Sequence, residues 1–295
     1  MSNIFQSIGM LARHRDEAVG DTLLRLGAFL RERGHRIALE REAAERLDGW
    51  SQASATREEI ARSSDLVIVV GGDGTLLHAA RSMADRDVPL LGVNLGRLGF
   101  LTDISPDNML DTLDRILTGD YDEEKRFLLR AEVGPPGRPD ASRKAFNDVV
   151  IHKWNIARMI EFETHVDGRF VETQRADGLI VATPTGSTAY ALSGGGPLLD
   201  PALNALVMVP ICPHTLSNRP IVVSGDCVID IAICGRTDPR NVRITCDGGD
   251  SLKASREDRI RIRKDEHPIR LIHPSGHDHF NILRAKLGWS GHPVK

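Results

Sequence analysis

Leu66-Val-Ile-Val-Val-Gly-Gly-Asp-Gly-Thr75 is the stretch that decides the fold. Its first five residues are apolar and four of them are β-branched, as in a strand that is buried on both faces of a parallel sheet. Glycines then surround Asp73, and Leu76–Ala84 has the periodicity of a helix. A doubly wound sheet binds its ligands at such strand-to-helix turns, so residues 71–75 are the first candidate for a phosphate-binding loop.

Strand and helix alternate on both sides of this stretch. Asp16–Arg33 carries apolar residues at helical spacing, and Val88–Val93 predicts a second buried strand. Ser105, which precedes a proline, predicts the start of a helix that Gly119 ends. This order predicts a doubly wound α/β domain over residues 1–143.

The alternation stops at the proline- and glycine-rich segment 134–140. Nearly every later segment predicts a strand, and Asp167-Gly168 predicts a two-residue hairpin turn. We therefore expect an all-β sandwich over residues 144–265, followed by a tail, residues 266–295, that becomes helical near its end.

Composition excludes several classes of protein. The 295 residues carry a formal net charge of −3, which gives no basic surface for nucleic acid. The four cysteines form no C-x-x-C pair and are typical of thiols in a reducing compartment. The sequence shows neither a signal peptide nor an apolar run that could cross a bilayer. We expect a soluble, cytoplasmic protein without nucleic-acid or membrane partners.

The glycine loop at residues 71–75 leaves two roles open for Asp73. A carboxylate beside phosphates is unfavourable unless it binds a cation or transfers a proton. The alternative is that Asp73 only caps the helix that follows. The sequence has neither the P-loop pattern nor G-x-G-x-x-G, so an ordinary P-loop enzyme or Rossmann dinucleotide site is not indicated.

Two further polar segments are ambiguous when taken alone. Asn94–Leu101 places two glycines three residues apart after a buried strand, as either a ligand loop or a plain turn requires. Asn147-Asp148 lies within a strand-like segment, where both residue types are depleted. A bulge would explain this pair, and so would a site for sugar hydroxyls or an exocyclic amine.

The densest motif is Asp177–Pro197, which contains six hydroxyl side chains and five glycines. Apolar residues flank it, so we favour a structured loop over a solvated one. Hydroxyl donors, glycine backbone and the aromatic ring of Tyr190 suit a nucleotide pocket. His273, His277 and His279 form an H-x-x-x-H-x-H pattern without a cysteine, and we interpret them as a solvated loop before the last helix rather than a metal site.

Taken in order, the four motifs resemble those of the NAD kinase family. Gly71–Thr75 is similar to its G-G-D-G signature, Asn94–Leu101 to its N-x-G-x-x-G-F-L loop and Asn147-Asp148 to its N-[DE] pair. Asp177–Pro197 is similar to its long D-G-x-x-x-x-T-P-T-G-S-T-A-Y stretch, and the likeness runs from Ile4 to Trp289. Lipid kinases share only the first motif.

The resemblance implies an enzyme that transfers the γ-phosphoryl of ATP to the 2′-hydroxyl of the adenosine ribose of NAD, giving NADP. It implies that the dinucleotide is held between the two domains and that residues 266–295 return to the first domain. A divalent metal ion, expected to be Mg²⁺, would neutralise the triphosphate. The resemblance further implies that the chain forms a homodimer or homotetramer. It also implies that Asp73 is the base that accepts the ribose proton. The substrate-binding residues implied are Gly72, Asp73, Gly74, Asn147, Asp148, Arg158, Arg175, Asp177, Thr188, Ala189, Tyr190, Ala191, Leu192, Ser193, Cys212 and Gly249. Many relatives have glutamine at the position of Gly249, so no side-chain contact is expected there.

Two other functions are compatible with parts of the sequence. A lipid kinase would need an apolar entrance or membrane-binding element, and the sequence shows none. A non-catalytic NAD-binding regulator would have no use for an acidic residue among phosphate-binding glycines. The sequence leaves open whether ATP or polyphosphate is the donor, whether NADH is accepted and whether NADP(H) regulates the enzyme.

Overall fold

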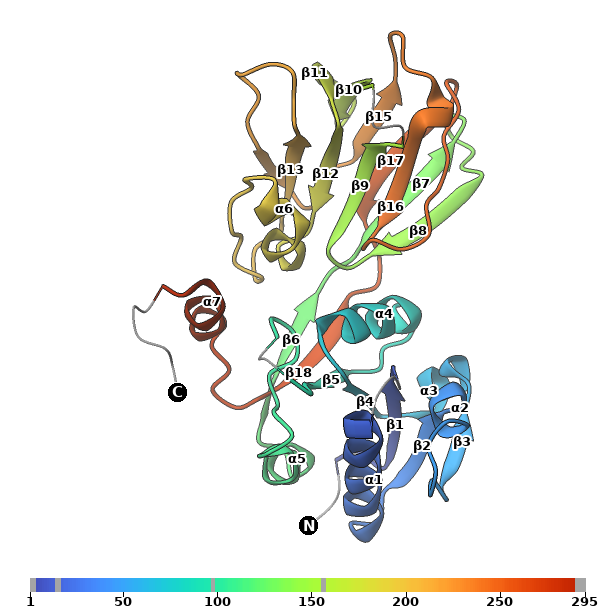
Figure 1. The fold of residues 1–295 in the computed structure, drawn as a ribbon, viewed down its shortest axis with the longest axis vertical. Coiled ribbons are helices and arrows are strands. Elements are labelled where there is room, and N and C mark those ends of the chain that lie inside the picture. Colours follow the sequence, from blue (N-terminus) through green and yellow to red (C-terminus); the bar gives the residue numbers. More distant parts are fainter. Residues whose placement is uncertain (1–3, 14–16, 97–98, 155–157, 290–295) are drawn as a thin grey trace. The chain divides into compact units, whose positions relative to one another are not determined.

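The computed structural model describes residues 4–13, 17–96, 99–154 and 158–289 (Figure 1). The chain divides into two compact units, the first made of Met1–Lys125 with Ile269–Lys295 and the second of Arg126–Pro268. No helix in the described part of the chain is long and apolar enough to span a membrane.

The first unit is built on a seven-stranded sheet. Its order is β3 (Ala53–Ala55), β2 (Arg36–Glu40), β1 (Ser7–Ala12), β4 (Leu66–Val70), β5 (Leu90–Val93), β18 (Ile269–Pro274) and β6 (Tyr121–Arg126). The pairs from β3 through β18 are parallel. The chain moves outward from β1 to β3 and then returns to β4 on the other side of β1, which makes the carboxyl ends of β1 and β4 the switch point of a doubly wound sheet.

Helices complete this unit and cover an apolar core. They are α1 (Glu17–Glu32), α2 (Arg41–Ala44), α3 (Arg57–Ser63), α4 (Asp73–Met83), α5 (Met109–Leu117) and α7 (His279–Leu287). Every residue of β4 is fully buried, as its apolar sequence predicts. The predicted helix start at Ser105 is wrong: α5 begins at Met109 after Asn108, and the Ser105 hydroxyl bonds the Asn108 side chain rather than a backbone N–H group.

The second unit is a sandwich of two antiparallel sheets, which confirms the predicted fold class. The six-stranded sheet has the order β11 (Arg169–Ala176), β10 (Ile160–Val166), β15 (Ile229–Ile233), β17 (Arg259–Lys264), β7 (Leu129–Gly134) and β8 (Ala141–Ala145). The five-stranded sheet has the order β14 (Ile221–Ser224), β13 (Ala205–Ile211), β12 (Gly178–Ala182), β9 (Asp148–Lys153) and β16 (Val242–Cys246). Apolar residues of both sheets share one core, including Ile151, Phe162 and Ile260. Short helical turns are η1 (Thr185–Thr188), α6 (Tyr190–Ser193) and η2 (Pro239–Asn241).

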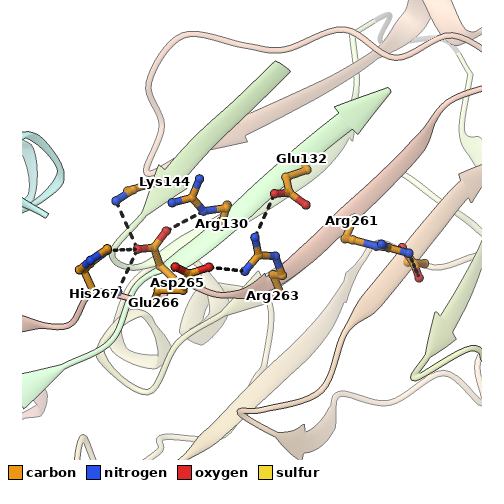
Figure 2. Close-up of polar contacts among 9 residues, drawn as sticks. Arg130, Glu132, Lys144, Arg261, Arg263, Asp265, Glu266 and His267 are labelled. Atoms are coloured by element: carbon orange, nitrogen blue, oxygen red, sulfur yellow. Dashed lines mark hydrogen bonds and ion pairs between the residues drawn. The ribbon is translucent and has the colours of Figure 1, made fainter. Parts of the chain in front are cut away.

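Ion pairs join neighbouring strands on the polar face of the six-stranded sheet (Figure 2). The buried carboxylate of Asp265, just after β17, lies 2.8 Å from Arg130 Nε of β7 and 3.2 Å from Lys144 Nζ of β8. Arg263 of β17 contacts Glu132 of β7 at 3.2 Å. On the other side of β17, Arg261 Nε lies 2.8 Å from Asp230 of β15, so the arginines of β17 form ion pairs with both neighbouring strands.

The second unit begins earlier than the sequence predicts. β7 pairs with both β17 and β8, so residues before the expected boundary already belong to the sandwich. The boundary lies between Lys125 and Arg126, and the expected one after residue 143 falls inside β8. The tail returns to the first unit as predicted, since β18 pairs in parallel with β5. The second unit is thus inserted between β6 and β18, which are neighbours in one sheet.

Candidate active site

Asp73 is the first residue of α4, at the carboxyl end of β4. Gly72 is the N-cap residue, and no side chain caps this helix, so the interpretation of Asp73 as a cap is wrong. Instead, its Oδ2 accepts the N–H of Phe100 at 2.8 Å, and its Oδ1 accepts the N–H of Leu101 and the hydroxyl of Thr102, each at 3.1 Å. The first two motifs of the sequence therefore meet at this carboxylate.

The structure requires glycine at some positions of these two motifs and leaves room for a side chain at others. A side chain at Gly99 would overlap Asp73 Oδ1, so the loop can approach the carboxylate only with glycine there. Gly71 has φ of 151°, a conformation that other residues rarely adopt. A Cβ at Gly72 or Gly74 would meet no atom within 4 Å. The protein's own packing does not require glycine at these last two positions, and open backbone at a helix N-terminus is suited to an anion.

A cavity of about 320 Å³ adjoins the glycine loop at the switch point. It is lined by Ala12, Arg13, Glu40, Glu42, Ala43, Arg46, Arg57, Gly74, Thr75 and His78. Arg57 forms an ion pair with the buried Glu40, and its Nη1 is buried without a hydrogen bond. Burial, followed by the positive charge of Arg57, lowers the pKa of His78. Sequence reasoning missed these basic residues, although Arg13 directly follows β1 at the ligand-binding edge of the sheet.

In the second unit, Asn147 and Asp148 lie at the edge of the five-stranded sheet where β9 begins. The carboxylate of Asp247 accepts the backbone N–H groups of Phe146, Asn147 and Asp148 at 2.9, 2.8 and 3.1 Å. Asp247 has φ of 49° and follows β16, whose last residue pairs with Val149. It fixes the backbone of the Asn-Asp pair from a position about 100 residues away, which no local pattern could indicate.

Asp148 is buried next to this second carboxylate. Burial, together with the negative charge of Asp247, raises the pKa of Asp148 to about 7. The side chain can therefore exist in both protonation states near neutral pH. A carboxyl that can donate as well as accept is suited to hydrogen-bonding hydroxyls or ring nitrogens of a ligand.

The loop after β12 begins at the same edge, because Ala182, the last residue of β12, pairs with Asp148. Thr183 donates its hydroxyl to the carbonyl of Phe146 at 2.7 Å, and the Ser187 hydroxyl donates to the Pro184 carbonyl and accepts the Leu199 N–H. A side chain at Gly186 would overlap the Asn147 carbonyl. The hydroxyl groups of Thr183 and Ser187 therefore stabilise the conformation of the loop through bonds to its own and neighbouring backbone, rather than facing solvent.

The rest of this loop carries the exposed candidates. In α6, Tyr190 is 47% exposed and Ser193 is exposed, whereas Ala191 is buried and Leu192 half-buried. Thr188 and Ala189 bond back to the carbonyls of Thr185 and Gly186. Gly249 is exposed in the turn after β16, where its N–H bonds the Cys246 carbonyl. In Figure 1, α6 lies at the end of β12 from which this loop leaves.

The other four predicted site residues lie at the opposite end of the sandwich: Asp177 and Cys212 flank β12 and β13 of the same sheet, whereas Arg158 precedes β10 and Arg175 lies in β11 of the six-stranded sheet. Asp177, which precedes β12, forms an ion pair with Lys153 at the far end of β9, with 2.6 Å between Nζ and Oδ1. Arg175 and Cys212 are exposed near it, and Arg158 is exposed just before β10. β9 has six residues, so this edge lies roughly 17 Å from Asp148 at about 3.3 Å per residue. Within the second unit, the structure does not bring Arg158, Arg175, Asp177 and Cys212 together with Asn147 and Asp148.

Comparison with known proteins places both units in one family. Residues 10–121 match the ATP-NAD kinase N-terminal domain, and residues 146–274 match the ATP-NAD kinase C-terminal domain. The NAD kinase of Nitrosococcus oceani is 47% identical over 290 residues, covering 98% of each chain. The NAD kinase of Cellvibrio japonicus is 48% identical over 296 residues, covering 99% of this chain and 98% of the relative.

Solved structures agree with this assignment. Yeast NADH kinase complexed with NADH gives a TM-score of 0.88 at 23% identity, over 97% of this chain and 88% of the yeast chain, and so shares the fold. An NAD kinase from Archaeoglobus fulgidus in complex with ATP gives a TM-score of 0.76 at 28% identity, over 96% of this chain and 98% of the archaeal one. On the strength of both domain models and these nearly full-length relatives, the chain belongs to the NAD kinase family.

Proposed function

We propose that Asp73 is the general base with which this NAD kinase accepts the proton of the adenosine ribose 2′-hydroxyl, as the γ-phosphoryl group of ATP is transferred to that oxygen. The observation that carries the proposal is the fixed carboxylate at the N-terminus of α4, beside glycines that the protein's packing leaves open. A ribose hydroxyl is a weak nucleophile near neutral pH, and a positioned carboxylate can accept its proton during attack.

The hydrogen bonds to Asp73 support this role because they fix the carboxylate without using all of its capacity. An ionised carboxylate offers about four acceptor positions, and loop residues 100–102 occupy three. One position on Oδ2 is left for a substrate hydroxyl. Phosphoryl transfer needs mainly positioning and charge neutralisation from a protein, so a rigid base beside an anion-binding loop is sufficient.

The donor is ATP, bound as its Mg²⁺ complex. The open backbone at Gly72 and Gly74 and the helix N-terminus are suited to phosphate oxygens. The adjoining cavity adds Arg13 and Arg46, whose positive charges can offset further negative charge, and His78, whose lowered pKa keeps it a neutral hydrogen-bonding group. The archaeal relative was solved in complex with ATP, which supports the same donor here.

The dinucleotide is bound by the edge of the five-stranded sheet that carries Asn147, Asp148 and Tyr190. Asp148 can exchange hydrogen bonds with polar groups of NAD, and the exposed Tyr190 ring offers a stacking surface. The yeast relative was solved with NADH, which supports a nicotinamide dinucleotide as the acceptor.

The chain works as a homodimer or homotetramer in the cytoplasm. Within the second unit the two groups of predicted binding residues lie at opposite ends of the sandwich, so a second copy that supplies Arg158, Arg175 and Asp177 would allow both groups to contact one dinucleotide. Four free cysteines suit a reducing compartment.

Asp73→Asn tests the proposal. Asparagine cannot accept the proton, so we expect kcat to fall by about 10²–10⁴-fold while the dissociation constant for NAD, measured by calorimetry, changes little. In asparagine one carboxylate oxygen is replaced by an NH₂ group, whose N–H faces a loop N–H. The free energy of unfolding should therefore fall by roughly 1–3 kcal/mol, which urea unfolding measures separately.

Thr102→Val is the matched control, because it removes one hydrogen bond to Asp73 and keeps the base. Its kcat should change far less than that of Asp73→Asn. Full activity of Asp73→Asn would contradict the general-base role. Recovery of its kcat at high Mg²⁺ would instead make Asp73 a ligand of the metal that accompanies ATP. NAD binding without any turnover in the wild-type protein would indicate a regulator rather than a kinase.

A further inference from the structure

Three side chains outside the site described above converge in the first unit. Asp103 follows the loop that bonds Asp73, His273 lies in β18, and His277 lies in the turn before α7. Asp103 Oδ2 lies 3.0 Å from His273 Nδ1 and 2.8 Å from His277 Nδ1. The two imidazole rings stack with their centroids 3.9 Å apart. The expectation that these histidines form a solvated loop is therefore wrong for His273 and His277.

The cluster is buried and its hydrogen bonding is incomplete. The side chains of His273, His277 and Asp103 are 2%, 6% and 10% exposed. Asp103 Oδ1 and His273 Nε2 are buried without a hydrogen-bond partner. Burial alone would raise the pKa of Asp103, but hydrogen bonds from His273 and His277 outweigh it and lower the pKa to about 2.

We propose that Asp103, His273 and His277 form a binding site for a divalent transition-metal ion of the Zn²⁺ class. One ligand atom from each residue lies within 4.8 Å of the other two. Ligand bonds of about 2.0–2.2 Å in a tetrahedral Zn²⁺ site place neighbouring ligand atoms about 3.3 Å apart. The observed separations from Asp103 are shorter by only a few tenths of an ångström, so the ion requires a small outward shift of the side chains.

The donor set and its surroundings indicate the class of metal. Two imidazole nitrogens and one carboxylate favour Zn²⁺ or Co²⁺ over Mg²⁺ and Ca²⁺, which prefer oxygen ligands. Glu124 Oε2 lies 3.8 Å from His273 Nε2, the nitrogen that faces away from the ion. A carboxylate behind a metal-binding histidine is a common outer contact that orients the ring. Water can take the fourth position.

The position of the site gives the ion a structural consequence. Asp103 directly follows Thr102, whose hydroxyl bonds Asp73. His273 and His277 flank the turn between β18 and α7. A bound ion would join this turn to the loop that holds Asp73, and would raise the stability of the first unit by an amount that grows with the logarithm of the ratio of free ion concentration to dissociation constant.

The competing explanation is a metal-free cluster in which both histidines donate to one carboxylate. Full-length, chelator-treated protein without nucleotide distinguishes the two, with Co²⁺ as the probe because its visible spectrum reports coordination geometry. We expect one equivalent of Co²⁺ to produce ligand-field bands of a four-coordinate site, Zn²⁺ to abolish them, and either ion to raise the Tm. Absence of these bands in wild-type protein would overturn the proposal.

Variants locate the site. Asp103→Asn keeps an oxygen that can accept hydrogen bonds, and His277→Ala removes one nitrogen, so each should weaken Co²⁺ binding by at least about tenfold. His267→Ala is the matched control, because His267 also lies beside an aspartate but in the second unit. Circular dichroism verifies folding of each variant. Unchanged Co²⁺ affinity in both Asp103→Asn and His277→Ala would place the metal elsewhere and refute the assignment.

Discussion

Asp148→Asn should stabilise the protein, and more so as pH rises. In the folded chain Asp148 keeps its proton until about pH 7, whereas its ordinary pKa is 3.8. The folded state therefore binds more protons than the unfolded state between these values, and raising the pH through this window favours unfolding. The stabilising contribution of the protonated carboxyl is complete below about pH 4 and lost above about pH 7.

The size of the effect follows from the pKa itself. A tenfold change in a protonation equilibrium corresponds to about 1.4 kcal/mol, so holding Asp148 ionised costs roughly 4 kcal/mol. Asparagine has nearly the same shape and cannot ionise. The difference in unfolding free energy between Asp148→Asn and wild type should therefore grow by about 3 kcal/mol from pH 5 to pH 8.

Urea unfolding at several pH values between these limits measures this difference. Asp250→Asn is the control, because Asp250 is an exposed carboxylate on the turn after β16. If the Asp148→Asn difference depends on pH no more than the Asp250→Asn difference does, Asp148 is already ionised in the folded protein and the argument from burial and Asp247 fails. The variant should also raise the KM for NAD, because Asp148 is proposed to bind the dinucleotide and stability gained at a ligand site commonly lowers function.

Gly99→Ala should lower kcat because the added methyl group overlaps Asp73 Oδ1. Gly96→Ala is its control and should leave kcat unchanged, because a methyl group there meets nothing within 4 Å. Equal kcat values for the two variants would contradict the packing argument. Tyr190→Ala should raise the KM for NAD by an amount equivalent to roughly 1–3 kcal/mol. Its unfolding free energy should stay near that of wild type because the ring is 47% exposed, and an unchanged KM would remove Tyr190 from the binding site. Asp265→Asn should destabilise the fold by about 3 kcal/mol without affecting kcat, since it leaves two cations without their buried partner. Burial raises the pKa of Asp265, but its backbone and cationic partners lower it below the ordinary value. The loss of unfolding free energy caused by Asp265→Asn, measured with urea, should therefore shrink as pH falls through the acid range. A loss of unfolding free energy that is independent of pH would contradict this.

The fold was predictable where the chemistry is local. Leu66–Val70 could only be a doubly buried strand, and the glycines after it placed the candidate loop at the correct edge of the sheet. The role of Asp73 within that loop was not decidable locally. The sequence alone left helix capping open, and the structure excludes it because the side chain bonds residues 100–102.

Contacts between distant residues could not be predicted. Asp247 fixes the Asn147-Asp148 backbone through strand pairing that brings β16 beside β9. The pairing of β12 with β9 places Asp177 at the far end of β9, although Thr183 of the same motif lies beside Asn147. Asp103 meets His273 across 170 residues, and histidine spacing alone therefore indicated a solvated loop.

The insertion of the second unit sets the order in which the first can be completed during translation. β18 leaves the ribosome last among the strands, yet it lies between β5 and β6. A nascent chain therefore holds β5 with an unpaired edge while the whole sandwich is being made, and such edges are templates for aggregation. The sandwich itself can be completed before β18 is synthesised, because all of its own strands precede β18 in the chain. Truncation before Ile269 would remove β18 and leave the edge of β5 permanently unpaired, as it is in the nascent chain.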